Sequence, residues 1–353
     1  MKIVAMLLAV AAVGFGAAQD VRVKVDPNGN GSIDSRTEYK TIQNALDHAP
    51  EAPHGRLYIE IVPGVYHERI NVTRLRPRVA LIGLGKGPED VVITASQNAK
   101  LAGGTYFSET AQINADDFEA FNLTFANEAG NTGQAVAATV RADRAIFKRC
   151  RFLGHQDTLF ADYGRQYYMD SYIEGGVDFI FGNATAVFDH DEIHALSPGY
   201  LTAQSRTSPE QTTGYVIVDS KVTTTIGSDA DVASRPKAGD AGATSTALAM
   251  KGGRAFTYLG RPWRMYSRVV VMRTELPEAL APQGWSKWKT NDAEIPKAFY
   301  AEYANYGPGW RPTERATWAK MLTAKEAKQF EAGIFFKGWN AIRESRALHA
   351  SDQ

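Results

Sequence analysis

Residues 146–160, IFKRCRFLGHQDTLF, and residues 167–181, YYMDSYIEGGVDFIF, read as two copies of one segment, and this pair decides the fold. The copies are offset by 21 residues, so Asp157 in the first copy matches Asp178 in the second. A fixed period on this scale is typical of solenoids, in which each copy forms one turn and equivalent positions stack about 4.8 Å apart. The pattern therefore predicts that the two carboxylates are neighbours on one face of the protein.

The repeat extends on both sides of this pair. The segment FNLTF at 121–125 precedes it and VFDHDEI at 187–193 follows it. Short strands thus recur at intervals of about 20 to 26 residues, and each unit supplies one short apolar run, whereas a propeller blade needs four strands. We therefore predict an all-β fold of the parallel β-helix type.

Length and composition agree with a single elongated domain. The chain has 353 residues, of which 44% are hydrophobic, which is enough to bury a sizeable core. We place the domain at residues 19–353. Lys plus Arg and Asp plus Glu both number 39, so the formal net charge is zero. Because the net charge is zero, the protein has no overall positive electrostatic field, and the composition gives no reason to expect a nucleic acid or an anionic membrane as a partner.

The N-terminus has the pattern of an export signal at residues 1–18. One positive charge at Lys2 precedes a short apolar stretch, and small residues stand at Gly16 and Ala18. This is typical of a secretory signal peptide, and we expect cleavage after Ala18. A membrane anchor is the alternative, but the apolar run is shorter than the ~20 residues of a spanning helix. We expect a secreted or periplasmic protein with no membrane association after cleavage.

The single cysteine, Cys150, rules out an intramolecular disulfide. It matches Ser171 in the next copy, and a lone cysteine in a strand is usually a small buried apolar residue. We therefore expect Cys150 to face the interior of the solenoid, and we set nucleophilic cysteine chemistry aside.

Several segments outside the repeat have clear secondary-structure patterns. Residues 39–48 form an amphipathic pattern and predict a helix that covers the open N-terminal end of the solenoid. Glycine-rich turns, one of them at 64–68, separate strands that we predict at 57–62, 79–82 and 91–94.

The last third of the chain departs from the repeat in two places. Residues 224–245 are rich in Gly, Ser, Ala and Asp and contain few large apolar residues, which predicts a long exposed loop within the domain. Residues 323–332 are helical in pattern, and we expect this tail to pack back along the solenoid.

Candidate chemistry concentrates at Gln134, Gln156, Asp157 and Asp178, which recur in successive coils. Stacked amides beside stacked carboxylates supply hydrogen-bond donors for an oxyanion, a nucleophile and a proton donor, which are the parts needed for acyl transfer. A plain polar ladder on the surface is the alternative. The apolar setting of Asp178, in VDFIF, argues against it, because a carboxylate among large hydrophobic residues is costly unless it is paired or used.

A cation for this carboxylate is offered by the segment LGRPW at 259–263. Arg261 stands in a stiff Gly and Pro context, and Trp263 presents an aromatic face beside it. A guanidinium can orient a carboxylate and keep it ionised, while an aromatic ring can stack on the apolar face of a sugar. The pattern favours an acidic sugar as substrate, and a structural loop with a surface arginine is the alternative.

Taken together, these motifs resemble the ordered signature of the pectin methylesterases, and the similarity extends from about residue 23 to residue 339. The resemblance implies a right-handed, single-stranded parallel β-helix. The motifs that carry it are GVYHE at 64–68, QAVA at 134–137, GHQDTL at 154–159, DFIFG at 178–182 and LGRPW at 259–263.

By this resemblance each site residue has an implied role in releasing methanol from methylated galacturonate. The nucleophile would be Asp178, and Asp157 would act first as general acid and then as general base. The remaining implied positions are Gln134 and Gln156 as the anion hole, Arg261 as the group that orients Asp178, and Trp263, Phe179, His155 and Tyr200 as substrate contacts. The resemblance implies no metal and no cofactor, and we expect a monomer.

Two positions depart from the family pattern. His155 stands where many members have tyrosine, and Ala138 stands where leucine is usual. Neither replaces a catalytic group, although His155 bears on substrate contacts and on the pH profile.

Other function classes fit parts of the pattern. Glycoside hydrolysis of polygalacturonate would also use clustered aspartates and water, but it would release reducing ends and no methanol. A relative of the same fold could act on another ester. A binding or cell-envelope protein that has lost the chemistry is disfavoured by the intact set of Gln134, Gln156, Asp157, Asp178 and Arg261.

Overall fold

The computed structural model describes residues 18–32, 34–226, 250–251, 254–288, 295 and 297–350. The predicted signal peptide therefore lies outside the described residues, apart from its last position. The predicted loop at 224–245 does so as well, apart from 224–226.

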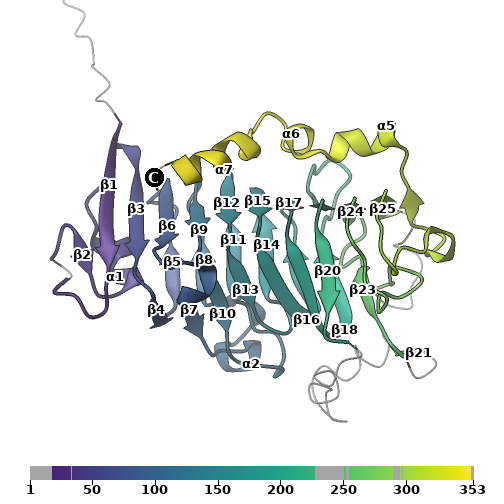
Figure 1. Cartoon of the computed structure of the whole chain (residues 1–353), viewed down its shortest axis with the longest axis horizontal. Helices are drawn as coiled ribbons and strands as arrows, with labels where there is room; N and C mark the ends of the chain where they lie inside the picture. Colours follow the sequence, from purple (N-terminus) through teal and green to yellow (C-terminus); the bar gives the residue numbers. More distant parts are fainter. Residues whose placement is uncertain are drawn as a thin grey trace, which may run out of the picture.

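Within these ranges the chain winds into a right-handed parallel β-helix, which confirms the predicted fold class. Figure 1 shows the coils stacked along the long axis, from β1 at one end to β25 at the other. Most complete coils carry three strands, so the solenoid has three faces. Face 1 is a twelve-stranded parallel sheet. Its strands, in spatial order, are β2 (Glu38–Tyr39), β1 (Gln19–Val25), β3 (His54–Ile61), β6 (Val79–Gly83), β9 (Glu119–Phe121), β12 (Ala145–Lys148), β15 (Arg165–Met169), β17 (Thr185–Asp189), β19 (Gly214–Val218), β24 (Arg268–Met272), β25 (Phe299–Tyr303) and β26 (Lys320–Met321).

Faces 2 and 3 are joined by two long strands, β16 (Tyr172–Gly182) and β18 (Glu192–Gln204), which run along both faces. Face 2 also contains β4 (Gly64–His67), β7 (Val91–Ala95), β10 (Thr124–Asn127), β13 (Arg151–Leu153) and β20 (Lys221–Thr224). Face 3 also contains β5 (Ile70–Val72), β8 (Ala111–Ile113), β11 (Ala138–Arg141), β14 (Leu159–Tyr163) and β23 (Thr257–Gly260). A short antiparallel pair, β21 (Met250–Lys251) and β22 (Arg254–Ala255), precedes β23.

The strand register confirms the repeat that the sequence predicts. Ile146 pairs with Tyr167 on face 1, and Leu159 pairs with Ile180 on face 3, so the offset is 21 residues on both faces. The predicted strands at 57–62, 79–82 and 91–94 are present as β3, β6 and β7. The turn predicted at 64–68 is wrong, because residues 64–67 form β4, in which Tyr66 is buried and its hydroxyl donates to the Val62 carbonyl.

The core between the three faces is built from stacked side chains of successive coils. Phe147, Tyr168 and Phe188 form one column, with ring centroids 4.9 and 4.7 Å apart and nearly parallel planes. Each fully buried aromatic or aliphatic side chain stabilises the fold by about 1.5–3 kcal/mol relative to exposure. Cys150 is buried, as predicted, and its backbone N–H donates to the Ser171 hydroxyl of the next coil.

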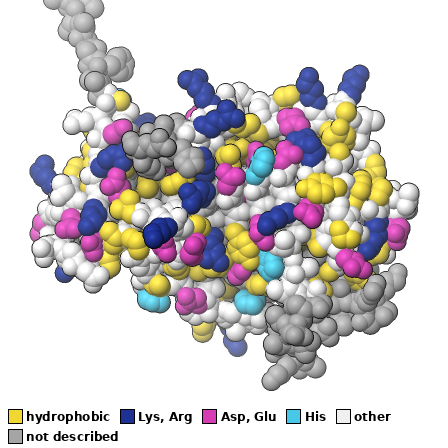
Figure 2. Space-filling model, viewed as in Figure 1, with side chains coloured by type: hydrophobic (Ala, Val, Ile, Leu, Met, Phe, Trp, Pro, Cys, Tyr) yellow, Lys and Arg dark blue, Asp and Glu magenta, His cyan; other side chains and the backbone are white. Residues whose placement is uncertain are grey.

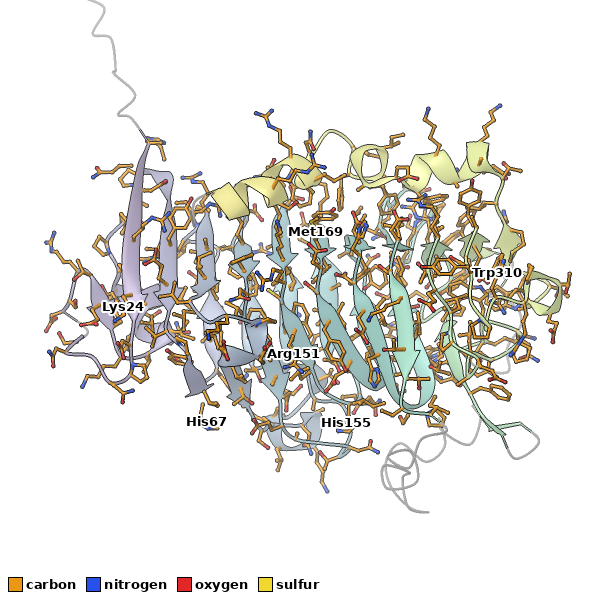
Figure 3. The ribbon with its side chains drawn as sticks, viewed as in Figure 1. Lys24, His67, Arg151, His155, Met169 and Trp310 are labelled. Atoms are coloured by element: carbon orange, nitrogen blue, oxygen red, sulfur yellow. The ribbon has the colours of Figure 1, made fainter. Side chains whose placement is uncertain are left out.

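Helices cover one end and one side of the solenoid. Helix α1 (Ile42–His48) packs against β1, β2, β3 and β5 at the N-terminal end of the solenoid as predicted, with Thr41 as its N-cap and an apolar side buried. The predicted C-terminal tail lies along face 1 (Figure 1), where Phe336 and Trp339 pack against face 1 side chains and Lys148 donates to the Ser345 carbonyl. Met169 lies beneath this tail in Figure 3, and the Ser345 hydroxyl contacts its sulfur. The helices of the tail are α5 (Ala324–Ala327), α6 (Ala332–Phe335) and α7 (Ala341–Ala350).

The remaining helical turns are short and lie in connections between strands. They are α2 (Ala99–Ala102), η1 (Pro88–Asp90), η2 (Thr105–Phe107) and η4 (Pro312–Glu314), whereas η5 (Lys328–Phe330) lies in the C-terminal tail between α5 and α6. Figure 2 shows acidic and basic side chains interspersed on the visible face, in keeping with the zero formal charge.

Candidate active site

Asp157 and Asp178 occupy the corner between faces 2 and 3 in successive coils. The bridge between Gln156 and Val177 sets this register, so the two aspartates stack directly. Both have left-handed backbone, with φ of 63° and 51°, a conformation that aspartate tolerates better than most residues. The corner is tightly packed, since a Cβ on Gly175 would lie 2.2 Å from the Cβ of Phe179. The backbone at this corner therefore fixes the position of each carboxylate.

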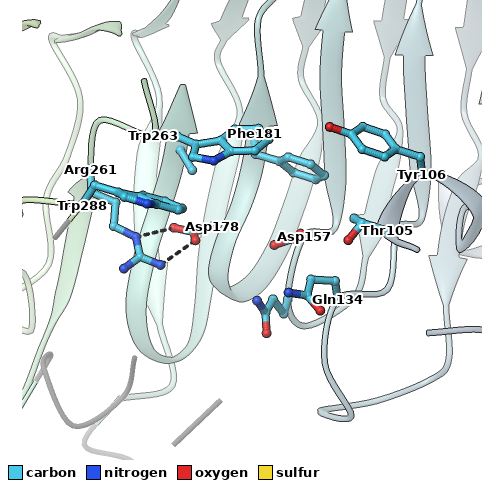
Figure 4. A pocket seen from close by; sticks show the side chains of 11 residues that line it. Thr105, Tyr106, Gln134, Asp157, Asp178, Phe181, Arg261, Trp263 and Trp288 are labelled. Atoms are coloured by element: carbon cyan, nitrogen blue, oxygen red, sulfur yellow. Dashed lines mark hydrogen bonds and ion pairs between the residues drawn. The ribbon is translucent and has the colours of Figure 1, made fainter. Parts of the chain in front are cut away.

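These carboxylates lie in a pocket of about 310 Å³ on the outside of face 3. The pocket brings together all five polar residues that the sequence singled out, from segments as far apart as 134 and 261. Figure 4 labels four of them, Gln134, Asp157, Asp178 and Arg261. Its lining consists of Thr105, Tyr106, Gln134, Gln156, Asp157, Asp178, Phe181, Ala203, Arg261, Trp263 and Trp288.

Arg261 forms a bidentate ion pair with Asp178. Its Nε donates to Oδ1 at 2.9 Å and its Nη2 donates to Oδ2 at 2.6 Å. Both side chains are buried, with 9% and 8% of their surface exposed, so the pair is little screened by solvent. Asp178 is thus a buried carboxylate whose orientation is fixed by the permanently charged guanidinium of Arg261.

The two aspartates differ in their electrostatic setting. Burial raises the pKa of Asp157 well above its usual value, and the adjacent Asp178 charge raises it further, while Arg261 opposes the shift only from a distance. Burial also raises the pKa of Asp178, but the hydrogen bonds and charge of Arg261 oppose that rise directly. When the pair holds one proton, that proton therefore resides on Asp157, and Asp178 is ionised.

Two amides complete the polar part of the pocket. Gln134 and Gln156 are bridge partners in adjacent coils. Within the described part of the chain, neither side-chain amide has a hydrogen-bond partner, and both line the pocket beside Asp157. Two free N–H donors next to a carboxylate can stabilise negative charge on an oxygen of a bound ester.

An aromatic wall borders the same pocket. Phe160 and Phe181 stack at 4.4 Å with an interplanar angle of 4°, and Trp263 lies 6.2 Å from Phe181. Trp288 continues the wall 6.2 Å from Trp263, and Tyr106 lies 5.3 Å from Phe160 at the other end. Flat apolar surfaces of this kind suit the faces of sugar rings.

The four expected substrate contacts have different outcomes. Trp263 lines the pocket. Phe179 is completely buried in the core, so the prediction that it contacts substrate is wrong. Tyr200 is 1% exposed and lies under Arg261, so it is closed to a ligand in the pocket. His155 is half-buried among the loops at the lower edge of Figure 3, outside the pocket lining, and burial lowers its pKa. A role for His155 stays a prediction.

Sequence reasoning missed several lining residues. Phe181 and its partner Phe160 occupy equivalent positions of the two copies, so the repeat itself could have indicated them. Thr105, Tyr106 and Trp288 come from connections that do not follow the repeat, and their sequence neighbourhoods carry no comparable signal.

No three His, Cys, Asp or Glu side chains among the described residues are grouped so that they could hold a metal ion. No helix in the same ranges is long and apolar enough to cross a membrane.

Fold and site together define a β-helix hydrolase with two stacked carboxylates, one of them held by arginine. A family model described as Pectinesterase matches residues 30–339, and the chain belongs to this family. It is therefore an enzyme, a carboxylic ester hydrolase.

Individual relatives agree in sequence and in fold. Pectinesterase 31 of Arabidopsis thaliana is 35% identical over 319 residues, which cover 87% of this chain and 90% of that protein. A pectinesterase of Daucus carota is 37% identical over 328 residues, covering 90% and 96%. The chain covers only 52% of the Solanum lycopersicum protein named pectinesterase/pectinesterase inhibitor U1, at 37% identity.

Solved structures give the same result. The pectin methylesterase from carrot matches with a TM-score of 0.77 and 34% identity, covering 93% of this chain and 97% of that one. A pectin methylesterase in complex with a hexasaccharide matches with a TM-score of 0.68 and 26% identity, covering 90% and 98%.

Proposed function

We propose that this chain removes methyl groups from esterified galacturonate units of pectin, with Asp178 as nucleophile and Asp157 as general acid and base. The observation that carries the proposal is the asymmetry of the two stacked carboxylates. Asp178 is ionised and oriented by Arg261, whereas Asp157 retains a proton at the same corner one coil away. Nucleophilic acyl transfer needs one carboxyl group in each of these states.

In the first half-reaction, an Asp178 oxygen bonds to the ester carbonyl carbon, and the carbonyl oxygen becomes negatively charged. The amides of Gln134 and Gln156 donate to this oxyanion. The carbon–methoxy bond then breaks, and the leaving methoxide takes the Asp157 proton and departs as methanol. The product is an anhydride between Asp178 and the galacturonate.

In the second half-reaction, Asp157 is a carboxylate and accepts a proton from water. The resulting hydroxide bonds to the galacturonate carbonyl carbon, and the bond to Asp178 breaks. The galacturonate leaves as a free acid, Asp178 is again a carboxylate and Asp157 is again protonated, so both groups return to their starting states.

The aromatic wall supports a carbohydrate substrate. Tyr106, Phe181, Trp263 and Trp288 present ring faces on both sides of the carboxylate pair, so sugar units adjacent to the reacting ester can stack there. The solved relative bound to a hexasaccharide supports an oligosaccharide or polymer as ligand for this chain.

We also propose that the protein is exported through a signal peptide at residues 1–18, folds as one domain over 19–353 and acts as a monomer, either secreted or periplasmic. The support is the charged, apolar and small-residue pattern of the N-terminus. Mass spectrometry of the exported protein tests the cleavage, and a mature N-terminus elsewhere than Gln19 contradicts the proposed site. Light scattering of the purified protein tests the monomer.

The function is tested by following methanol and reducing ends in parallel on highly methylated pectin. We expect methanol without new reducing ends from the wild type, and no methanol from Asp178→Ala. Asp170→Asn is the matched control, because Asp170 has the same left-handed backbone at another corner and is exposed outside the pocket.

New reducing ends would support glycoside hydrolysis. Methanol release by a folded Asp178→Ala variant would overturn the assignment of the nucleophile. Activity on simple esters combined with inactivity on pectin would assign the site to another ester.

A further inference from the structure

Arg261 lies against two aromatic rings as well as against Asp178. Its guanidinium carbon is 3.8 Å from the ring centroid of Tyr200 and 4.3 Å from that of Trp288. These distances are well inside the range of about 6 Å in which a cation is attracted by a ring face. The charged group that orients the carboxylate is therefore itself held by aromatic contacts.

Tyr200 is a rigid part of the solenoid. It lies in β18, where its register partners are Val177 in the preceding coil and Tyr258 in the following coil. The ring of Tyr258 stacks on that of Tyr200 at 5.6 Å and 24°. With 1% of its surface exposed, Tyr200 presents a fixed ring face to Arg261.

Trp288 contacts the same guanidinium from a connection outside the repeat. It is partly exposed in the pocket and packs against Trp263. The backbone of Arg261 is anchored separately, since its N–H donates to the Thr202 carbonyl at 3.0 Å. Both the start and the end of the Arg261 side chain are thus held in place.

This arrangement has a direct electrostatic consequence. Rings against the guanidinium exclude water from it, while its N–H edge remains free to donate to Asp178. An ion pair is stronger where water is excluded, and an arginine that cannot leave its rotamer holds the bidentate geometry during the reaction. Among the described residues, the titratable groups that bear on Asp178 are Arg261, which is charged, and Asp157, which retains its proton while Asp178 is ionised.

We propose that Tyr200 and Trp288 are positioning residues, which hold the Arg261 guanidinium flat so that its bidentate contact keeps Asp178 ionised and correctly oriented. This inference rests on the proposed roles of Asp178 and Arg261 in catalysis. It assigns Tyr200 an indirect role through Arg261 in place of the substrate contact expected from sequence.

The test uses Tyr200→Leu, which removes the ring face, and Tyr200→Phe, which keeps it. For Tyr200→Leu we expect kcat to fall about tenfold with little change in KM, since a cation–ring contact is lost without loss of a substrate contact. We expect the acid limb of the kcat/KM profile to move up by about half a pH unit or more, because a displaced Arg261 raises the pKa of Asp178. Tyr200→Phe should restore both values.

A matched control and a double-mutant cycle separate positioning from packing. Tyr258→Leu removes the next ring of the column, which does not contact Arg261, and should leave the acid limb unchanged. In an Arg261→Lys background, Tyr200→Leu should cost far less activity than in the wild type, because the group it acts through is already lost. Trp288→Leu tests the second ring if Tyr200→Leu does not fold. Its readout is the acid limb, because Trp288 also lines the pocket and its loss removes a proposed sugar contact.

The inference is overturned if folded Tyr200→Leu and Trp288→Leu keep wild-type kcat and acid limb, or if Tyr200→Leu changes only KM. Equal losses from Tyr200→Leu with and without Arg261 would also overturn it. Failure of the proposed function is distinguishable, because Asp178→Ala and Arg261→Ala would then remain active. Circular dichroism and thermal melting establish that each variant is folded.

Discussion

Asp157 and Asp178 share one corner of the solenoid in successive coils, yet only Asp178 is bonded to Arg261. Stacking makes the two positions nearly equivalent in backbone geometry, with φ of 63° and 51°. The arginine removes that equivalence, because it favours the ionised form of one carboxyl group. A repeat that would otherwise produce two identical acids thus produces one ionised and one protonated carboxyl group, the two states that the proposed nucleophile and proton donor require.

This asymmetry predicts a pH–rate profile with two limbs. Activity should rise as Asp178 ionises and fall as Asp157 loses its proton, and the alkaline limb should lie well above the usual carboxyl pKa of about 4, because burial and Asp178 raise the pKa of Asp157. Asp157→Asn should abolish the alkaline limb and lower kcat by about 10² to 10⁴. The profile of kcat/KM on methylated pectin measures both effects. An alkaline limb that persists unchanged in Asp157→Asn would assign it to another group.

The unpaired side-chain amides of Gln134 and Gln156 predict that shortening either side chain lowers kcat. Gln134→Ala and Gln156→Ala should each lower kcat by about 10² to 10³ with little change in KM, as expected for donors that act mainly on a developing oxyanion. Gln112→Ala is a suitable control, because Gln112 lies in β8 on the same face but outside the pocket lining. Steady-state kinetics of the three variants decide the question. A rise in KM without a fall in kcat would make the amides substrate-binding groups only.

The buried ion pair predicts that removing Arg261 alone lowers the stability of the protein more than removing both Arg261 and Asp178. Arg261→Ala leaves the Asp178 carboxylate uncompensated and should lower the free energy of unfolding by about 3–5 kcal/mol. The double variant Arg261→Ala with Asp178→Ala should recover part of this loss, because no buried charge remains. Urea unfolding at neutral pH measures the stability of the wild type, of Arg261→Ala and of the double variant. If the double variant is the least stable, the pair contributes mainly through packing.

Another buried carboxylate, Asp191, predicts a pH-dependent stability unrelated to catalysis. Its Oδ1 accepts the Ser171 N–H at 2.7 Å, whereas Oδ2 is buried without a partner among the described residues. Burial raises its pKa well above the usual value, and Asp189 and Asp170 raise it further. The folded state therefore binds the proton more tightly than the unfolded state. Stability must fall as pH rises from about 4, the unfolded value, toward the folded pKa.

Asp191→Asn removes this titration. The free energy of unfolding of the variant should exceed that of the wild type by an amount that is near zero at about pH 4 and grows by up to about 1.4 kcal/mol per pH unit above it. Glu128→Gln serves as the control, because Glu128 is exposed and is not among the groups that shift the pKa of Asp191. Unfolding curves at a series of pH values test the difference, and parallel pH dependence of the wild type and Asp191→Asn would contradict the assignment.

The sequence predicted the repeat, its 21-residue register and the stacking of Asp157 on Asp178, because in a parallel solenoid equal positions in successive copies must be neighbours. It misassigned Phe179 for a local reason. The left-handed backbone of Asp178 turns the corner and breaks the alternation of the strand, so Phe179 and Ile180 both face the core, and the ring in the pocket is that of Phe181.

Spacing along the chain by itself determined the coil, the core columns and the row of polar groups at one corner, since these depend only on residues that recur with the period. Tertiary structure alone decided what surrounds that corner. The rings of Tyr106 and Trp288 come from connections whose paths do not repeat. The motif at 259–263 and the family resemblance indicated Arg261 as the partner of Asp178, but the contact itself spans 83 residues of sequence and forms only in the folded chain. The repeat does not encode these side-chain contacts, because they depend on where loops of irregular length return to the solenoid surface.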